Sequence, residues 1–190
     1  MAILKVARMG HPVLRQQARP IESRELKTVP LQRLIDDMLE TMQEYTGVGL
    51  AAPQVHEALR LFVAHIDPDG RGESDPIAII NPAIEVIGTL MVEGWEGCLS
   101  IPDIRGMVPR AQQIRVRALD RHGKRIEINA KDFPARVIQH ETDHLDGVLF
   151  LDRMRSFQSL TFMEEFSRYH ARRDEDDEEA DEDDDEDDDE

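Results

Sequence analysis

The sequence predicts an α+β fold in which antiparallel strands wrap around a central helix that carries an H-E-x-x-H motif. Three observations lead to this fold class. An amphipathic helical pattern stands near residue 38, several short β-branched segments follow it, and a second helical segment contains His140, Glu141 and His144. We see no internal repeat, so residues 1–173 are predicted to form one domain with a core large enough to fold alone.

The first helix is predicted around residues 31–45, where apolar side chains recur at the three- and four-residue spacing of one helical face. Pro30 stands near its start, a position at which a missing backbone N–H is tolerated. The apolar positions of this face are Leu31, Leu34, Ile35, Met38, Leu39, Met42 and Tyr45.

Strands are predicted where β-branched and apolar residues dominate or alternate with polar neighbours. Residues 61–66 and 77–87 are of the first kind. The alternating kind lies on both sides of a hairpin turn that we place at His122 and Gly123. Its apolar positions are Ile114, Val116, Ala118, Ile126 and Ile128. These segments are expected to pair as antiparallel strands.

The second helix is expected to begin with Asp132 as the cap of its first turn and to tolerate Pro134 there. Gly147 suits its C-terminal end. An apolar stripe extends the histidine side of this helix, so we expect that side to be buried against the core. The stripe consists of Phe133, Val137 and Leu145.

The motif inside this helix is typical of metal-dependent hydrolases. His140 and His144 are four residues apart, so both rings can reach one ion while Glu141 lies beside it. A catalytic site usually has three protein ligands, and Phe150 stands where one large protease group has its third histidine. Cys98 is the only cysteine; such a residue can be a small buried hydrophobe, but here it is favoured as the third ligand.

Three segments resemble the signature motifs of the peptide deformylase family, in the same order. They are Gly47-Val48-Gly49-Leu50-Ala51-Ala52-Pro53-Gln54, then Glu96-Gly97-Cys98-Leu99-Ser100, then Gln139-His140-Glu141-Thr142-Asp143-His144-Leu145-Asp146-Gly147. The resemblance extends from His11 to about Asp152. It implies a metal-dependent hydrolase that removes the formyl group from the N-terminal formyl-methionine of nascent polypeptides and releases formate. The implied site is ferrous and is held by Cys98, His140 and His144.

The chemistry of these residues agrees with that reaction. A bound divalent ion lowers the pKa of water from 15.7 to about 7. Glu141 can accept a proton from this water and return it to the departing amine. By resemblance, the side-chain amide of Gln54 and the backbone N–H of Leu99 stabilise the oxyanion together with the metal. The same ligands also accept zinc, nickel or cobalt, so the sequence leaves the identity of the metal open.

The resemblance also implies a substrate cleft. Gly49 would let the peptide backbone approach closely, although glycines here also suit a simple turn. Arg105 matches a position near the bound peptide, but it would also suit a solvated surface. Arg136 lies at a pocket position that is often aliphatic, which leaves the depth and polarity of the pocket open. The positions that match the pocket for the methionine side chain are Val48, Phe133 and Val137.

The end of the chain has a different composition. A helix is predicted from about residue 159 to 173, with Leu160, Met163, Phe166 and Tyr169 along one side. Residues 174–190 are acidic except for Ala180, and these 16 acidic residues leave 24 acidic and 23 basic residues in the rest of the chain. We therefore expect a single catalytic domain over residues 1–173 and a disordered acidic tail over residues 174–190.

Several expectations concern partners. The tail would be repelled by ribosomal RNA, so ribosome contact is expected to be transient, without specific nucleic-acid binding. The tail would serve solubility, or alternatively fold back over Arg168, Arg172 and Arg173. One cysteine, no secretory leader and no apolar run of membrane-spanning length predict a cytoplasmic protein that does not contact membranes. We also expect a monomer, although the sequence itself leaves the oligomeric state open.

Two other functions remain open from the sequence. A zinc endopeptidase would use the same motif, with Asp152 or a distant glutamate completing the site. A non-catalytic relative would keep the fold as a binding module, but it would have no evident need for Glu141. Release of formate from a formyl-methionyl peptide separates these possibilities.

Overall fold

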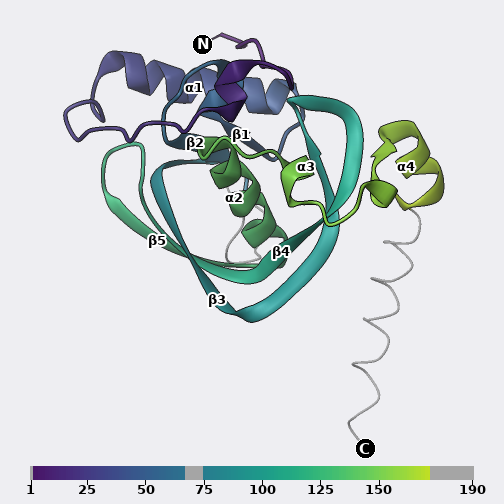
Figure 1. The fold of residues 1–190 in the computed structure, drawn as a ribbon. Helices are drawn as coiled ribbons and strands as arrows, with labels where there is room; N and C mark the ends of the chain where they lie inside the picture. The colour runs from purple at the N-terminus through teal and green to yellow at the C-terminus, as the bar shows by residue number, and fades with distance from the viewer. Residues whose placement is uncertain (1, 67–74, 172–190) are drawn as a thin grey trace, which may run out of the picture.

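The computed structural model describes residues 2–66 and 75–171, and its strands form one antiparallel sheet (Figure 1). The strand order is β1-β2-β3-β4-β5, and β6 pairs with β4. The predicted combination of helices with antiparallel strands is therefore confirmed. The expected acidic tail lies outside the described residues. The strands are β1 (Gly49–Ala51), β2 (Leu61–Ala64), β3 (Ile77–Cys98), β4 (Ile101–Leu119), β5 (Arg125–Lys131) and β6 (Thr161–Phe162).

Two long helices lie on opposite faces of the inner strands. The first, α1 (Val29–Glu44), has Pro30 in its first turn and buries the face predicted from its apolar spacing. The second, α2 (Asp132–Leu145), lies in the curve formed by β3, β4 and β5 (Figure 1). None of the described helices is long and apolar enough to cross a membrane. The shorter elements are η1 (Pro12–Arg15), η2 (Ala52–Val55), α3 (Phe150–Arg153), η3 (Phe157–Ser159) and α4 (Met163–Tyr169).

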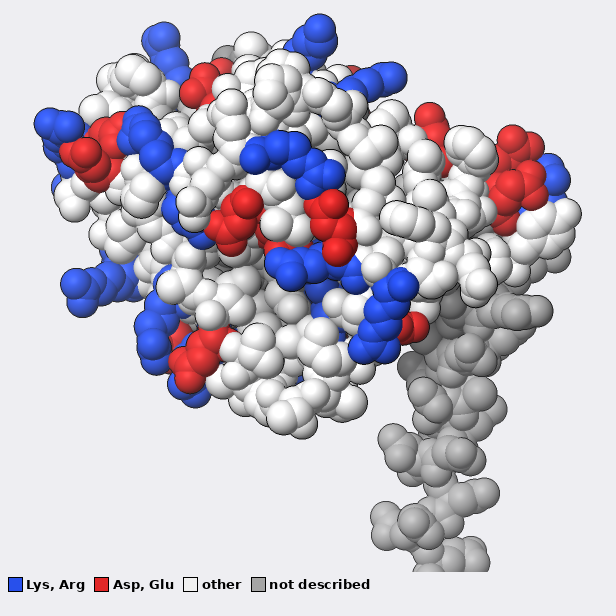
Figure 2. Space-filling model, viewed as in Figure 1, with Lys and Arg blue, Asp and Glu red and all other residues white. Residues whose placement is uncertain are grey.

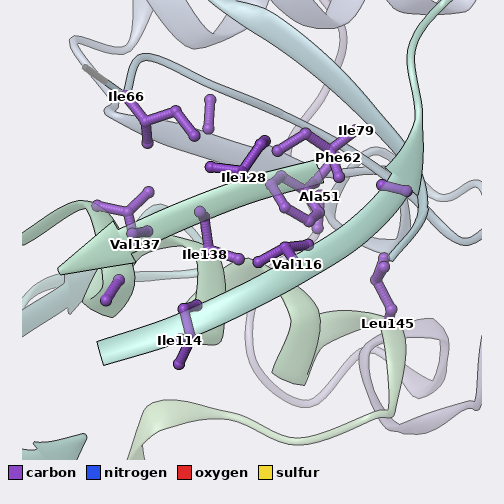
Figure 3. Packing of buried hydrophobic residues seen from close by; sticks show 14 of the residues in the cluster. Ala51, Phe62, Ile66, Ile79, Ile114, Val116, Ile128, Val137, Ile138 and Leu145 are labelled. Atoms are coloured by element: carbon purple, nitrogen blue, oxygen red, sulfur yellow. The ribbon is translucent and has the colours of Figure 1, made fainter. Parts of the chain in front are cut away.

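Strand β2 separates two hydrophobic cores because successive side chains of a strand point to opposite faces. Leu61 and Val63 pack in the core that contains the buried face of α1. Phe62 packs in the other core, against the apolar side of α2 (Figure 3). All four residues of β2 are buried, which explains why residues 61–66 form an almost continuous apolar run.

The core around α2 confirms part of the predicted stripe and corrects another part. Val137 and Leu145 are buried, together with Ile138 (Figure 3). Phe133 is 57% exposed and does not extend the buried side. It lies in the first turn of the helix. The strand residues that pack against α2 in this core include Phe62, Ile79, Ile114, Val116 and Ile128.

The two ends of α2 differ in how well the sequence predicts them. Asp132 begins the helix but does not cap it: the N-cap position falls on Lys131, and no side chain caps the first turn. Asp132 has a φ of +56°, which is the left-handed region and not the extended backbone of an N-cap. At the other end, Gly147 has a φ of +73°. Its N–H donates to the His144 carbonyl, which closes the helix as predicted.

Strands β3 and β4 are much longer than the sequence patterns predict. The strand expected over residues 77–87 continues to Cys98, and the two strands form a bent hairpin around α2 (Figure 1). The pairing shifts register at three places, one of them between Gly97 and Cys98. Such bulges bend a strand and increase its twist. The bend aims Cys98, the last residue of β3, toward α2.

The C-terminal region also departs from the prediction of one helix over residues 159–173. Thr161 and Phe162 instead pair with β4 as strand β6, and this extended pairing delays the helix to Met163. The hydroxyl of Ser159 accepts a hydrogen bond from the Met107 N–H, which ties the connection to β4. Residues 172 and 173 lie outside the described part of the chain.

We expect Gly147→Ala to destabilise the fold more than Gly88→Ala. Both glycines have nearly the same φ, +73° and +74°, so either alanine should cost about 1–2 kcal/mol in backbone strain. Only at Gly147 would the new Cβ lie 2.8 Å from the backbone of Arg15, whereas Gly88 faces open space. Urea denaturation of both variants measures the difference. Equal losses of stability would contradict the close packing of α2 against η1.

Candidate active site

The structure brings together the three side chains predicted to bind metal. Cys98 comes from the end of β3, and His140 and His144 come from successive turns of α2. The ligand atoms of the three residues lie within 4.8 Å of one another. The Cys98 Sγ is 3.2 Å from the His144 Nε2. Two elements that are distant in sequence therefore form one cluster of soft donors.

The charges in this cluster favour a thiolate. Burial opposes ionisation of the Cys98 thiol, but the rings of His144 and His140 outweigh it and hold the pKa of Cys98 well below its usual value. Burial also disfavours the charged form of His140, yet Cys98 and Glu96 raise the pKa of its ring well above the usual value. The thiolate is the form of cysteine that binds metals.

These residues fit a divalent metal ion. One thiolate and two imidazole nitrogens suit zinc or ferrous iron, and three protein ligands leave a coordination position open. The His140 Nδ1 lies 2.9 Å from the Glu96 Oε2, so the other ring nitrogen is left for an ion. The Nδ1 of His144 is buried without a hydrogen-bond partner in the described part of the chain.

A buried network of charges positions the ligands, and the sequence analysis did not assign it a role. Glu96 accepts two hydrogen bonds from Arg110, at 2.8 and 2.9 Å, in addition to its contact with His140. Burial raises the pKa of Glu96, but Arg110 and His140 outweigh it and lower the pKa to about 2. Arg110 also donates to Asp143 at 2.6 Å. Glu96 and Asp143 both lie inside the segments that resemble the family motifs. Their position in these segments was the signal in the sequence that could have assigned them to the site.

Glu141 stands beside the cluster and is buried. Its Oε2 has no hydrogen-bond partner among the described residues. Burial is the main cause that raises the pKa of this carboxyl. Gly49 faces it so closely that a Cβ at that position would overlap the carboxylate. The arrangement leaves one buried carboxylate oxygen of Glu141 without a partner among the described residues, beside the metal ligands.

Gln54 lies on the other side of the cluster, and its amide has a defined orientation. The Oε1 accepts a hydrogen bond from the Ala51 N–H at 2.7 Å, so the Nε2 must point the other way. That nitrogen donates to the Ser100 hydroxyl at 3.3 Å and lies 3.5 Å from the Cys98 Sγ. Leu99 occupies the tight turn between β3 and β4, next to Cys98.

A cleft of about 820 Å³ opens onto these side chains. It contains nearly every residue that the sequence analysis assigned to the site; His144 is buried beneath it. Trp95, Lys5 and Arg8 also line the cleft, and nothing in the sequence patterns singled them out. The predicted residues that line it are Val48, Gly49, Gln54, Cys98, Leu99, Arg105, Phe133, Arg136, Val137, His140 and Glu141.

Arg136 lines the cleft but directs its charge toward the hairpin. Its Nη1 donates to the Val108 carbonyl at 2.7 Å and to the Glu96 carboxylate at 2.9 Å. Its Nη2 donates to the Val92 carbonyl at 2.8 Å. The guanidinium therefore fastens α2 to β3 and β4, and it forms an ion pair with Glu96, which Arg110 also contacts.

The residues proposed for a protease-like site are not at the cluster. Asp152 forms an ion pair with Arg15 and accepts a hydrogen bond from the Leu149 N–H at 2.7 Å. Phe150 is buried with its ring stacked on that of His140, at 6.3 Å between centroids. The described residues place no further acidic ligand in the cluster.

The chain is similar to known proteins over most of its length. The family model described as polypeptide deformylase matches residues 3–159. Peptide deformylase 2 of Nostoc sp. is 45% identical over 86% of this chain and 93% of that protein. Peptide deformylase 1 of Bordetella pertussis is 44% identical over 86% of this chain and 92% of that protein.

Solved structures give the same result. The peptide deformylase of Thermotoga maritima has a TM-score of 0.74 and 38% identity, over 82% of this chain and all of that one. The actinonin-bound class I type b enzyme of Acinetobacter baumannii has a TM-score of 0.74 and 39% identity, over 81% of this chain and 99% of that one. The resemblance in the three motifs is thus confirmed along most of the sequence, and the chain belongs to the peptide deformylase family.

Proposed function

We propose that this chain hydrolyses the N-formyl group of formyl-methionine at the start of nascent polypeptides, at the cluster of Cys98, His140 and His144. Membership of the peptide deformylase family supports the reaction. The convergence of the three donor atoms within 4.8 Å is the observation that supports this location. A peptide substrate agrees with the related enzyme of A. baumannii that is described as bound to Met-Ala-Ser.

We propose that Cys98 Sγ and one ring nitrogen each of His140 and His144 hold a single divalent ion. Fe²⁺ is the ion that the family resemblance favours, and Zn²⁺, Ni²⁺ or Co²⁺ would fit the same donors. When bound, the ion acidifies water and polarises the formyl carbonyl. The buried carboxylate of Glu96 orients His140 for this role, because it accepts the hydrogen bond from the other ring nitrogen.

Glu141 is proposed as the general base and then the general acid. Its buried carboxylate has a raised pKa and an oxygen without a partner in the described structure, which suits proton transfer near neutral pH. It accepts a proton from the water that attacks the formyl carbon. It then donates this proton to the nitrogen as the C–N bond breaks, which releases formate and the free amine of methionine.

Gln54 and Leu99 are proposed to stabilise the oxyanion. The Gln54 Nε2 points toward Cys98 because the Oε1 is held by the Ala51 N–H, so the donor is oriented before substrate arrives. Leu99 follows Cys98 in the tight turn of the hairpin, where its N–H is proposed as the second donor. Donors held in place in this way need no reorganisation during the reaction.

The substrate is proposed to bind along the cleft. Val48 and Phe133 are exposed apolar side chains at its wall, and the buried Val137 lies on the same helix as Phe133. Gly49 lies on the wall along which the peptide backbone is proposed to run, and Arg105 can donate to a carbonyl of the bound peptide. The methionine side chain would thus bury apolar area against Val48, Phe133 and Val137.

We also make proposals about the domain, the location and the ribosome contact of the protein. We propose that residues 1–173 act as a single catalytic domain, that the protein is a cytoplasmic monomer and that its ribosome contact is transient. The near balance of 23 basic and 24 acidic residues outside the tail supports weak contact with RNA. The ion pair between Asp152 and Arg15 argues against the endopeptidase alternative.

Release of formate from a formyl-methionyl tripeptide tests the proposed reaction, and Glu141→Gln tests the proposed proton transfer. We expect the variant to lose about 10²- to 10⁴-fold in kcat, because an amide cannot accept the proton. Its metal content should stay at the level of the unaltered chain. Glu57→Gln, at an exposed carboxylate, is the control and should keep full activity. A fully active Glu141→Gln would remove Glu141 from the mechanism.

Cys98→Ser should lower metal retention, because a neutral hydroxyl replaces the thiolate ligand. Elemental analysis after anaerobic purification and gel filtration measures the metal-to-protein ratio and also identifies the ion. Urea denaturation in the presence of a chelator is the control, since the two metal-free chains should then have similar stability. Unchanged metal content in the variant would exclude Cys98 as a ligand.

A further inference from the structure

The last described helix packs against the wall of the cleft. The ring of Phe166 on α4 lies edge-on to the ring of Trp95, at 5.0 Å between centroids. The ring of His170, next after the helix, lies 5.0 Å from Trp95. Trp95 itself lines the cleft. Because the family model matches only residues 3–159, this part of the wall lies outside the matched region.

The same helix also positions Arg105. The Arg105 Nε lies 3.0 Å from the Met163 Sδ, and the guanidinium lies over the Phe166 ring, 5.1 Å from its centroid. A cation over an aromatic face is attracted to it. Helix α4 therefore holds two cleft-lining side chains, Trp95 and Arg105, on one side of the opening.

The acidic residues begin close to this contact. Asp174 follows His170 by four residues, so it can lie at most about 14 Å from His170 along an extended chain. The 16 acidic residues of positions 174–190 continue from there, with a reach of up to about 70 Å. Every charged group at the opening of the cleft is therefore within reach of this segment.

Cationic side chains surround the opening. Lys5 and Arg8 are exposed, line the cleft and have no ion-pair partner among the described residues. Hydrogen bonds from the Ala7 N–H to the Gln54 carbonyl and from the Met9 N–H to the Ser100 carbonyl fix this segment beside the site. The exposed acidic side chain on the same opening is Asp103. We call Lys5, Arg8 and Arg105 the basic rim.

The cation on α4 itself is already paired. Arg168 on α4 contacts Glu164 and Glu165, at 3.2 and 3.4 Å. Figure 2 shows groups in which basic and acidic side chains lie side by side, separated by uncharged areas, so the face that it draws does not present a continuous basic surface. The alternative that the tail covers Arg168 is therefore less favourable than contact with the basic rim. Arg172 and Arg173 lie outside the described residues.

We propose that residues 174–190 dock across the basic rim and compete with the peptide substrate for the outer part of the cleft. A short tether gives the segment an effective concentration of about millimolar at the rim. Each exposed ion pair is weak, so substrate can displace the segment, and salt weakens the docking. The docking is independent of the proposed function, whereas its effect on substrate affinity rests on that function.

Trp95 provides a direct test because it is the only tryptophan of the chain and lines the same cleft. The comparison is between the full chain and a variant of equal length, in which Asn and Gln replace the acidic residues of positions 174–190. Raising salt from about 0.01 to about 1 M shortens the screening length from about 30 to about 3 Å. We expect the Trp95 emission of the full chain to shift toward that of the neutral-tail variant, which should itself respond little.

The matched control is a variant that removes positive charge from the basic rim and leaves residues 174–190 unaltered. In the full chain, Lys5→Gln combined with Arg8→Gln should remove the salt response of Trp95. Neither residue has a proposed role in catalysis or in peptide binding. If the salt response persists in this double variant, the segment docks elsewhere and the proposal is overturned.

Steady-state kinetics test whether residues 174–190 compete with the peptide substrate. At low salt, the neutral-tail variant should have a KM for a neutral formyl-methionyl tripeptide about threefold lower than that of the full chain, with the same kcat. The difference should vanish at about 1 M salt. An equal KM in the two chains at low salt would overturn the competition.

Two further outcomes also decide the proposal. The same salt response of Trp95 in the full chain and the neutral-tail variant would overturn docking. A response that grows with protein concentration would place the tail on a second copy and overturn docking within one chain. If the expected emission changes occur but no variant releases formate, the proposed function has failed and the docking has not.

Discussion

The hydrogen bond between the buried carboxylate of Glu96 and the His140 ring is the contact on which the site depends. Glu96 lies on β3, two residues before Cys98, and His140 lies on α2, so this bond fixes the strand that carries the sulfur against the helix that carries the nitrogens. Arg110 balances the charge of Glu96 and extends the network to Asp143, one residue before His144. Removing the Glu96 carboxylate would take away the partner that the largely buried Arg110 and Arg136 guanidinium groups share, which is destabilising.

The surrounding fold also holds the sulfur of Cys98 close to the ring nitrogens of His140 and His144. Strand β2 is buried on both faces, so α1 and α2 each pack in a core of their own, and a shift of α2 would disturb the close packing of its core. The register shifts in β3 bend the hairpin around α2 and end it at Cys98. The left-handed backbone at Gly147 then closes α2 directly after the second histidine. The cleft that Glu141 lines forms where these elements meet.

Elements whose formation depends on residues close together in the sequence could be predicted from it. Helix α1 follows from its apolar spacing, and the two histidines share a face because they are four residues apart. The extension of β3 could not be predicted, since its outer half is exposed and its pairing with β4 is a non-local contact. Arg110 was missed for a similar reason. A charged residue suggests a surface position, and only the folded chain supplies the carboxylates that allow its burial.

Shared binding of one metal ion by Cys98, His140 and His144 can be tested directly. X-ray absorption spectroscopy of the purified chain loaded with zinc measures the donors directly. We expect one sulfur at about 2.3 Å and two imidazole nitrogens at about 2.0–2.1 Å from the ion. An ion surrounded by oxygen and nitrogen donors alone, without sulfur, would contradict it.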